Sequence, residues 1–238
     1  MKTLVLGVGN AGVSAVDHMS MRYDADYMAV DSDETSLKTA KVDDKVLMGE
    51  SVDLPLLEGH IGTGGQYDLG VKIAGASKDK IIKMVEGYDK VNVVAGLGGG
   101  TGSGSTKVIA EACDSVAEDI NIFVFFPFSM EGEKRKENAE KALEELRDGF
   151  EVEVLHLDDL IDEYSDMSLR TAFKVADEKM ARTMELPERP EEEVLKRKIE
   201  DKEREIKETE EEASKVRKDV EDLKEERKEL EQKLEEIN

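Results

Sequence analysis

The chain has 238 residues, a formal net charge of −23 at pH 7 and a single cysteine, Cys113. This length accommodates one sizeable domain with an appendage, and the excess of acidic side chains argues against direct binding to nucleic acid or to an anionic membrane surface. Because one cysteine cannot form an internal disulfide and no apolar stretch approaches the ~20 residues that span a bilayer, we expect a cytoplasmic protein without a transmembrane segment, which reaches membranes only through a partner.

The chain begins with a strand, a glycine loop and a helix. An apolar strand at residues 3–8 runs into the loop 7–12 and a helix to about residue 22, and a second strand, residues 27–31, ends in an acid. Taken alone, this GxGxxG pattern with an acidic residue ~20 positions on is typical of an NAD-binding Rossmann unit. One interpretation is therefore an NAD-dependent oxidoreductase built on Gly7, Gly9, Gly12 and Asp31, although the three histidines stand alone and suggest no catalytic set.

A second glycine loop follows at residues 62–66, after a possible short strand at 46–48 and before a helical pattern at roughly 67–87. An ordinary surface turn is the alternative interpretation of this loop. Together with the first loop, it suggests a site for more phosphates than a dinucleotide carries, which favours a nucleoside triphosphate.

The longest glycine run, residues 96–104, lies between a buried strand at 91–95 and a helix from residue 105. A strand and an amphipathic helix that adjoin the run directly argue against a flexible linker. Backbone N–H groups of such a turn approach a phosphate closely, and the helix N-terminus adds attraction. Since the run lacks the lysine of a P-loop, we expect backbone amides, the hydroxyls of Thr101 and Ser103, and Mg²⁺ to balance the phosphate charge.

The rest of the globular part alternates strands and helices. A strand at 121–126 precedes a helix at 131–147, and a strand at 152–157 precedes a helix at 168–184. Glu131 and Arg135 lie four residues apart and would share a helix face. This alternation predicts an α/β fold, a Rossmann-like three-layer structure with a parallel sheet between helices, over residues 1–187.

Residues 188–238 have a different composition, rich in Glu, Lys and Arg and without glycine. Apolar residues recur in heptads from residue 192, which predicts a coiled-coil helix of roughly 70 Å. The a positions hold Ile199, Ile206, Ala213, Val220, Arg227 and Leu234, and the d positions hold Leu195, Lys202, Thr209, Val216, Leu223, Leu230 and Ile237. A solvated single helix is the alternative.

The partner of this helix stays open on the sequence alone. In a parallel dimer, flanking pairs such as Lys198–Glu203 and Glu212–Arg217 attract, whereas Glu205–Glu210 repels. We therefore expect a homo-oligomer or a heteromeric helix partner through residues 192–238, with an antiparallel arrangement also possible.

Several blocks in residues 1–186 resemble the tubulin/FtsZ superfamily, and FtsZ in particular. They are the loop 7–17, the loop 62–66, the run 96–104, the segment Pro127–Arg135 and the segment Ala172–Glu178. The resemblance implies that GTP or GDP, with Mg²⁺ held through the phosphates, contacts Gly9, Asn10, Ala11, Gly12, Ser14, Gly62, Thr63, Gly64, Gly65, Gly98, Gly99, Gly100, Thr101, Gly102, Ser103, Glu131, Arg135, Phe173 and Asp177. It also implies that Glu131 meets the ribose, Arg135 the α-phosphate region, and that Phe173 and Asp177 bind guanine.

The sequence departs from the family pattern in two places. Ser14 and Leu157 stand where the family usually has asparagines near the guanosine, which implies looser affinity or base choice. After Met184 the heptad helix replaces the acidic loop and second domain that complete a neighbouring subunit's GTPase site. We therefore expect a cytoskeletal or scaffold protein with weak or no intrinsic hydrolysis. The alternative is a polymerisation-dependent GTPase in which a partner, or an acid such as Asp158, Asp159 or Asp162, replaces that loop.

Overall fold

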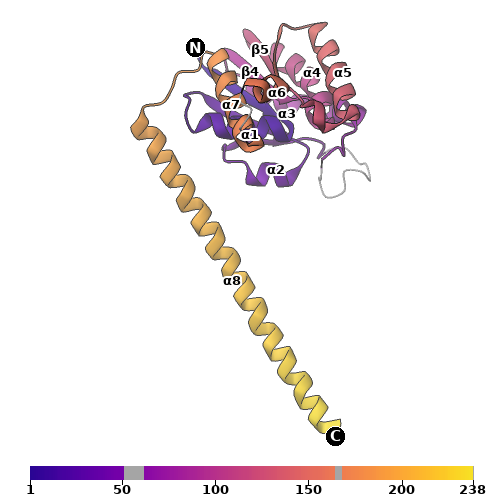
Figure 1. Ribbon diagram of the computed structural model, residues 1–238, viewed down its shortest axis with the longest axis vertical. Coiled ribbons are helices and arrows are strands. Elements are labelled where there is room, and N and C mark those ends of the chain that lie inside the picture. Colours follow the sequence, from indigo (N-terminus) through magenta and orange to yellow (C-terminus); the bar gives the residue numbers. More distant parts are fainter. Residues whose placement is uncertain (51–61, 164–167, 238) are drawn as a thin grey trace. The chain divides into compact units, whose positions relative to one another are not determined.

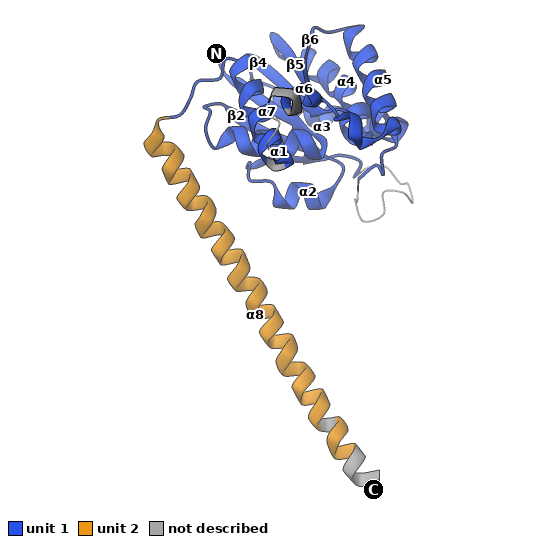
Figure 2. Cartoon of the chain, in the orientation of Figure 1, with its two compact units in different colours: residues 1–189 blue, residues 190–238 orange. Residues whose placement is uncertain are grey.

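The computed structural model of the protein describes residues 1–50, 62–163 and 168–237. The chain divides into two units, residues 1–189 and residues 190–238 (Figure 2). Unit 1 is an α/β structure and unit 2 is one long helix, so the predicted fold class is confirmed.

Six parallel strands form the sheet of unit 1, in the order β3-β2-β1-β4-β5-β6. Their bounds are β1 Thr3–Val8, β2 Asp26–Asp31, β3 Asp44–Leu47, β4 Lys90–Gly96, β5 Asp119–Phe126 and β6 Val152–His156. Val8, the last residue of β1, pairs with Val30 of β2 and Ala95 of β4. The segments that follow these three strands therefore leave the sheet at one edge, where the order reverses between β1 and β4.

Helices cover both faces of the sheet and make the three predicted layers (Figure 1). Apolar residues of α3 Tyr67–Val85, α4 Gly100–Asp114 and α5 Glu133–Arg147 pack on one face, in a core cluster that includes Leu4 and Leu6. On the other face, α1 Gly9–Ser20, α2 Glu34–Thr39, α6 Leu157–Glu163 and α7 Leu169–Thr183 pack against a cluster that includes Val5. A strand buried on both faces in this way reads as a continuous apolar run.

The structure corrects several predicted boundaries. The helix expected at 131–147 is two elements, because a 3₁₀ turn, η2 Ser129–Glu131, is separated from α5 by Gly132 at φ 98°. The strand expected to reach Leu157 ends one residue earlier, and that leucine starts α6. Neither α2 nor α6 was predicted, since each is too short to show a helical period.

Unit 2 consists of α8, Glu191–Ile237, whose 47 residues span roughly 70 Å. Ion pairs along the helix surface include Lys196–Glu192 at 2.6 Å and Arg227–Glu231 at 2.9 Å. The large apolar side chains at heptad positions are exposed in the single chain, and those described are Leu195, Ile199, Ile206, Val216, Val220, Leu223 and Leu230. None of the helices in the described part of the chain has the length and apolar character that a bilayer span requires.

Candidate functional site

The candidate site is a cleft at the edge of the sheet where β1 and β4 end. Two hollows of about 250 and 290 Å³ adjoin there and share five lining residues, Asn10, Ala11, Gly96, Leu97 and Arg135. One hollow is rich in glycine and hydroxyl groups, and the other is lined by apolar and aromatic side chains. The cleft is therefore suited to an elongated ligand with a polar and an apolar end.

Glycines bring the backbone segments of the polar end into contact. Gly9 and Gly98 have φ values of 70° and 105°, which residues with a Cβ rarely adopt. A Cβ on Gly102 would collide with the carbonyl oxygen of Gly96, and one on Gly100 would collide with the Thr63 hydroxyl. The loops that follow β1 and β4 and the loop 62–66 can therefore lie together only with glycine at these positions.

Two helices begin at the polar end without a side-chain cap. α1 starts at Gly9 and α4 at Gly100, and neither Val8 nor Gly99 supplies a capping hydrogen bond from its side chain. The first N–H groups of a helix have no intrahelical partner and carry partial positive charge. The polar end therefore presents backbone donors from two helices of 12 and 15 residues to an anion.

Hydroxyls and carboxylates from β2 and its following loop complete the polar end. The Thr101 hydroxyl lies 2.7 Å from that of Ser32 and 3.2 Å from that of Thr63. Asp31 and Asp33 also line this hollow. Burial raises the pKa of the Asp31 carboxyl, and hydrogen bonds from the Ser36 hydroxyl and from nearby backbone N–H groups partly oppose this shift. The Oδ2 atom of Asp31 is buried and has no hydrogen bond of normal geometry. These hard oxygen atoms are ligands that suit Mg²⁺ beside phosphates.

Four of the predicted site residues support the loops without lining the cleft. The Ser103 hydroxyl accepts a hydrogen bond from the Gly98 N–H at 2.7 Å, so it closes the third loop. Gly65 and Gly98 each accept from the side-chain amide of Asn138 at 3.1 Å. Gly12 lies against the backbone of β4, where a Cβ would collide with the carbonyl of Val94.

Asn138 supports the candidate site and was not predicted from the sequence. Its amide joins the second and third glycine loops, which are far apart in the chain. The available signal was a neutral amide one helical turn after Arg135 in a helix otherwise rich in charged residues.

The apolar end of the cleft contains the predicted base-binding pair. Phe173 of α7 is 44% exposed and packs edge-on against the buried Phe128, with ring centroids 5.7 Å apart. Asp177, one helical turn further on, is 8% exposed and lies with one carboxylate oxygen 3.2 Å from Nδ1 of His18 on α1. Burial raises the pKa of the Asp177 carboxyl, and the hydrogen bond and charge of His18 oppose this effect. Ser14 and Leu157 line the same hollow.

Glu131 and Arg135 lie between the two ends. Their side chains pair at 2.7 Å, and Glu131 also accepts a hydrogen bond from the Phe128 N–H at 3.0 Å. The two side chains are adjacent, but the expectation that they share one helix is wrong, because Glu131 belongs to η2 and Arg135 to α5.

Two of the acids suggested as replacements for a catalytic loop, Asp158 and Asp159, lie outside the cleft. Asp158 accepts hydrogen bonds from Ser129, and neither it nor the exposed Asp159 lines the cleft. The side chain of Asp162 lies outside the described residues. Within the described residues, no group of three or more His, Cys, Asp or Glu side chains could hold a metal ion.

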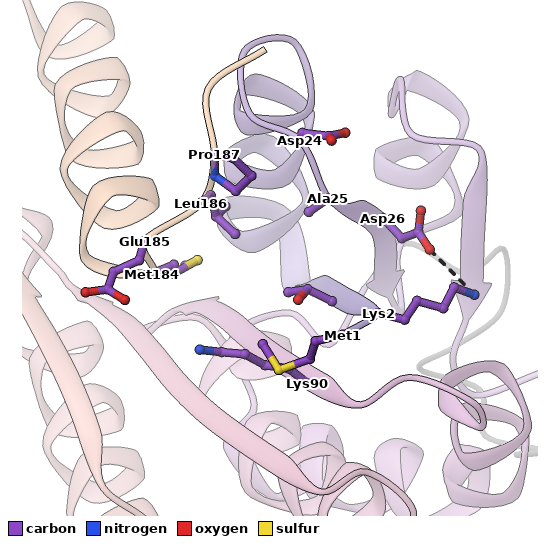
Figure 3. Close-up of a pocket in the computed structure, with 11 residues that line it drawn as sticks. Met1, Lys2, Asp24, Ala25, Asp26, Lys90, Met184, Glu185, Leu186 and Pro187 are labelled. Atoms are coloured by element: carbon purple, nitrogen blue, oxygen red, sulfur yellow. Dashed lines mark ion pairs between the residues drawn. The ribbon is translucent and has the colours of Figure 1, made fainter.

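A larger hollow, of about 490 Å³, lies at the opposite edge of the sheet, at the amino ends of β1, β2 and β4 (Figure 3). Its charged side chains have both signs, and Lys2 pairs with Asp26 at 3.6 Å. The residues that line this hollow include neither a helix N-terminus nor a glycine loop. This hollow therefore lacks the anion-binding features of the cleft.

A Rossmann-type sheet with three glycine loops and an aromatic–acid pair around one cleft is typical of a nucleotide-binding domain. Residues 2–161 match the Tubulin/FtsZ family, GTPase domain. The chain belongs to this family, and the interpretation as an NAD-dependent oxidoreductase is set aside.

Individual relatives agree with this assignment. The chain is 38% identical over 183 residues to cell division protein FtsZ 1 of Halobacterium salinarum. The matched stretch covers 76% of this chain and 45% of that protein. It is 37% identical over 186 residues to cell division protein FtsZ of Methanothermobacter thermautotrophicus, covering 77% and 48%. The chain thus spans about half the length of the curated relatives it matches.

Solved structures give the same result. An empty FtsZ dimer from M. jannaschii superposes with a TM-score of 0.68 at 34% identity and covers 75% of this chain and 52% of that one. A GTPγS-bound protofilament of CetZ2 from Haloferax volcanii superposes with a TM-score of 0.65 at 26% identity, covering 76% and 56%.

Proposed function

We propose that unit 1 binds GTP or GDP in the cleft. The observation that carries this proposal is that the cleft has two adjoining ends. One end is polar and lined by backbone groups, and the other has an exposed aromatic ring and a buried carboxylate. A polyphosphate suits the uncapped helix N-termini of α1 and α4, and a base with a polar edge suits Phe173 and Asp177. The family assignment supports guanine as that base.

The nucleotide lies with its phosphates against the three glycine loops. Backbone N–H groups and the hydroxyls of Thr63 and Thr101 contact the phosphates, and Mg²⁺ neutralises part of their charge. Asp31 and Asp33 are the carboxylates at this end that would hold the ion, directly or through water. Arg135 reaches the α-phosphate region, and Glu131 accepts from the ribose.

Guanine stacks on Phe173, and its N1–H and N2–H donate to Asp177. The Asp177 carboxylate is suited to this role because His18 orients it and because an ionised carboxylate only accepts hydrogen bonds. It therefore binds a base edge with two donors more tightly than an edge that carries an acceptor. Ser14 and Leu157 adjoin the base and contribute little polar selectivity.

Hydrolysis by the isolated chain is slow in this proposal. Phosphoryl transfer to water needs a positioned nucleophile and stabilisation of developing charge. The carboxylates that line the described part of the cleft are Asp31, Asp33, Glu131 and Asp177. The proposal assigns each of them to nucleotide or metal binding. The segment that follows α7 leads directly into α8. In this proposal the water-positioning acid comes from another chain.

The protein acts as a cytoskeletal or scaffold component that assembles or recruits a partner through α8. The exposed apolar heptad positions of α8 support this role. Dimeric and protofilament forms of the similar solved proteins support assembly of unit 1 as well. The second candidate is a GTPase that turns over only when assembled, with a neighbouring subunit or partner providing the acid.

Nucleotide titration tests the proposal. Binding of GDP, GTP, ADP, ATP and NAD is measured by calorimetry with and without Mg²⁺, and phosphate release is followed across a range of protein concentrations. We expect GDP and GTP to bind more tightly than the others, with negligible release at every concentration. Tighter binding of ATP or NAD would overturn the guanine assignment, and release that rises steeply with protein concentration would favour the assembly-dependent GTPase.

A further inference from the structure

We propose that α8 binds the α8 of a second copy of this chain in parallel and in register, forming a two-stranded coiled coil. This inference rests on the assembly role proposed for α8 and specifies its partner. We call the a and d positions of the heptads the seam. Its large apolar members are exposed in the single chain, from 44% for Val220 to 63% for Leu223.

The shapes of the seam residues favour two parallel strands. Three of the a positions are β-branched, at Ile199, Ile206 and Val220. Three of the d positions are leucines, at Leu195, Leu223 and Leu230. In parallel coiled coils, β-branched residues at a combined with leucine at d favour a two-stranded assembly.

Charges beside the seam agree with a second copy in register. In a parallel pair each g residue faces the e residue of the next heptad on the other helix. Four of these contacts join opposite charges, namely Glu191–Lys196, Lys198–Glu203, Glu212–Arg217 and Asp219–Lys224. The two that join like charges are Glu205–Glu210 and Glu226–Glu231.

The two like-charged contacts lie beside cations of the seam. Lys202, at a d position, pairs with Glu205 on its own helix at 2.6 Å, and Arg227, at an a position, pairs with Glu231 at 2.9 Å. In the parallel arrangement a d side chain also adjoins e of the second helix, and an a side chain adjoins g. Lys202 then meets Glu203 of the second copy, and Arg227 meets Glu226, so cations offset both repulsive contacts.

An antiparallel pair of the same length fits less well. With Ala213 opposite Val216, Arg227 falls in the same layer as Lys202, and two cations face each other in the seam. The e–e contacts of that register attract, but its g–g contacts, Lys198–Lys233, Glu205–Glu226 and Glu212–Asp219, all join like charges. The parallel pair is therefore the better electrostatic match.

A parallel coiled coil attaches two nucleotide-binding units at one end of a rod of roughly 70 Å. The dimer is then bivalent, and two units that each join a separate filament or partner surface link those surfaces. Such linkage raises the effective affinity without any new contact in unit 1.

Disulfide formation at the seam of the full chain tests the arrangement. We use the variants Leu195→Cys and Leu223→Cys, with Lys218→Cys on the outer face of α8 as the matched control. Burial raises the pKa of the native Cys113 to about 12, so this thiol stays inert. We expect mild oxidation to link each seam variant to itself, and the control to remain unlinked.

An antiparallel pair gives a different outcome. It places Leu223 opposite Ile206, about 25 Å along the helix from the second Leu223, so this variant would not link to itself. Absence of self-linkage at both seam positions, or a monomeric mass of the unmodified chain in light scattering, would overturn the proposal. GDP binding is measured on the same samples. Chains that link in register but bind no guanine nucleotide would refute the function proposed for unit 1 and leave the parallel dimer standing.

Discussion

The two ends of the cleft are built from different parts of the polypeptide. The polar end is built mainly from backbone N–H groups and from glycines that let three loops approach one another, with a few hydroxyls and carboxylates beside them. The apolar end is lined mainly by side chains, which come from α1, α6 and α7 and from β5 and the segment after it. Backbone groups bind any polyphosphate and are sensitive mainly to added bulk, whereas side chains can distinguish one base from another. Substitutions at the two ends should therefore fail in different ways.

The largest effect is expected at Gly102. In Gly102→Ala the new methyl group collides with the carbonyl oxygen of Gly96 and forces α4 away from β4. GDP and ADP affinity should both fall by about 100-fold, or about 2.7 kcal/mol, without a change in their ratio. Calorimetric titration with both nucleotides measures this.

Gly75→Ala is the matched control for that substitution. Gly75 is also helical, but a Cβ there meets no atom within 4 Å. The control should bind nucleotide normally and gain up to about 1 kcal/mol of unfolding free energy from helix propensity. Equal loss of binding in both variants would mean that the close approach at Gly102 is irrelevant to the site.

A smaller and selective effect is expected at Asp177. In Asp177→Asn the side chain presents an amide to the base edge, so one hydrogen bond becomes a donor–donor clash. GDP affinity should fall about 10- to 100-fold, whereas ADP affinity should be unchanged. Glu178→Gln, one residue away and paired with Arg22 at 3.2 Å, is the control. A parallel loss of GDP and ADP would show that Asp177 has only a structural role.

Acidification should separate binding from stability at the same residue. Because burial raises the pKa of Asp177, the folded protein takes up this proton at a higher pH than the unfolded chain. Protonation therefore increases the unfolding free energy as pH falls through that window, and Asp17 and Asp31, whose pKa values burial also raises, contribute with the same sign.

Guanine binding should change in the opposite direction, because its N–H donors need the ionised carboxylate. The ratio of GDP to ADP affinity should thus decline as pH falls through the raised pKa of Asp177. Taking the ratio cancels the titration of the phosphates, which both nucleotides share. A ratio that stays flat while Asp177→Asn still loses GDP selectivity would contradict the assigned ionisation.

The same contrast explains how far the sequence alone could predict this molecule. The strands, the longer helices and the three glycine loops follow local patterns, and parallel topology places the loops after β1 and β4 at one edge. The apolar end depends on which side chains tertiary packing brings together. The contact of His18 with Asp177 has no local signature, and the bridge from Asn138 to two loops is marked only by a neutral amide within a charged helix. Ser103 shows the converse, since its hydroxyl fits a phosphate-binding pattern but closes its own loop.

The smallest effect is expected at His18, whose Nδ1 lies 3.2 Å from Asp177 and which does not line the cleft. His18→Leu removes the donor that orients and stabilises the carboxylate, so GDP affinity should fall about 3- to 10-fold with ADP unaffected. His18→Asn places an amide donor near the position of Nδ1 and should restore most of the loss. Because a packing defect would lower the melting temperature of both variants alike, rescue of the GDP to ADP ratio by asparagine alone identifies His18 as a positioning residue. Equal ratios in the two variants would show that Asp177 holds its orientation without the imidazole.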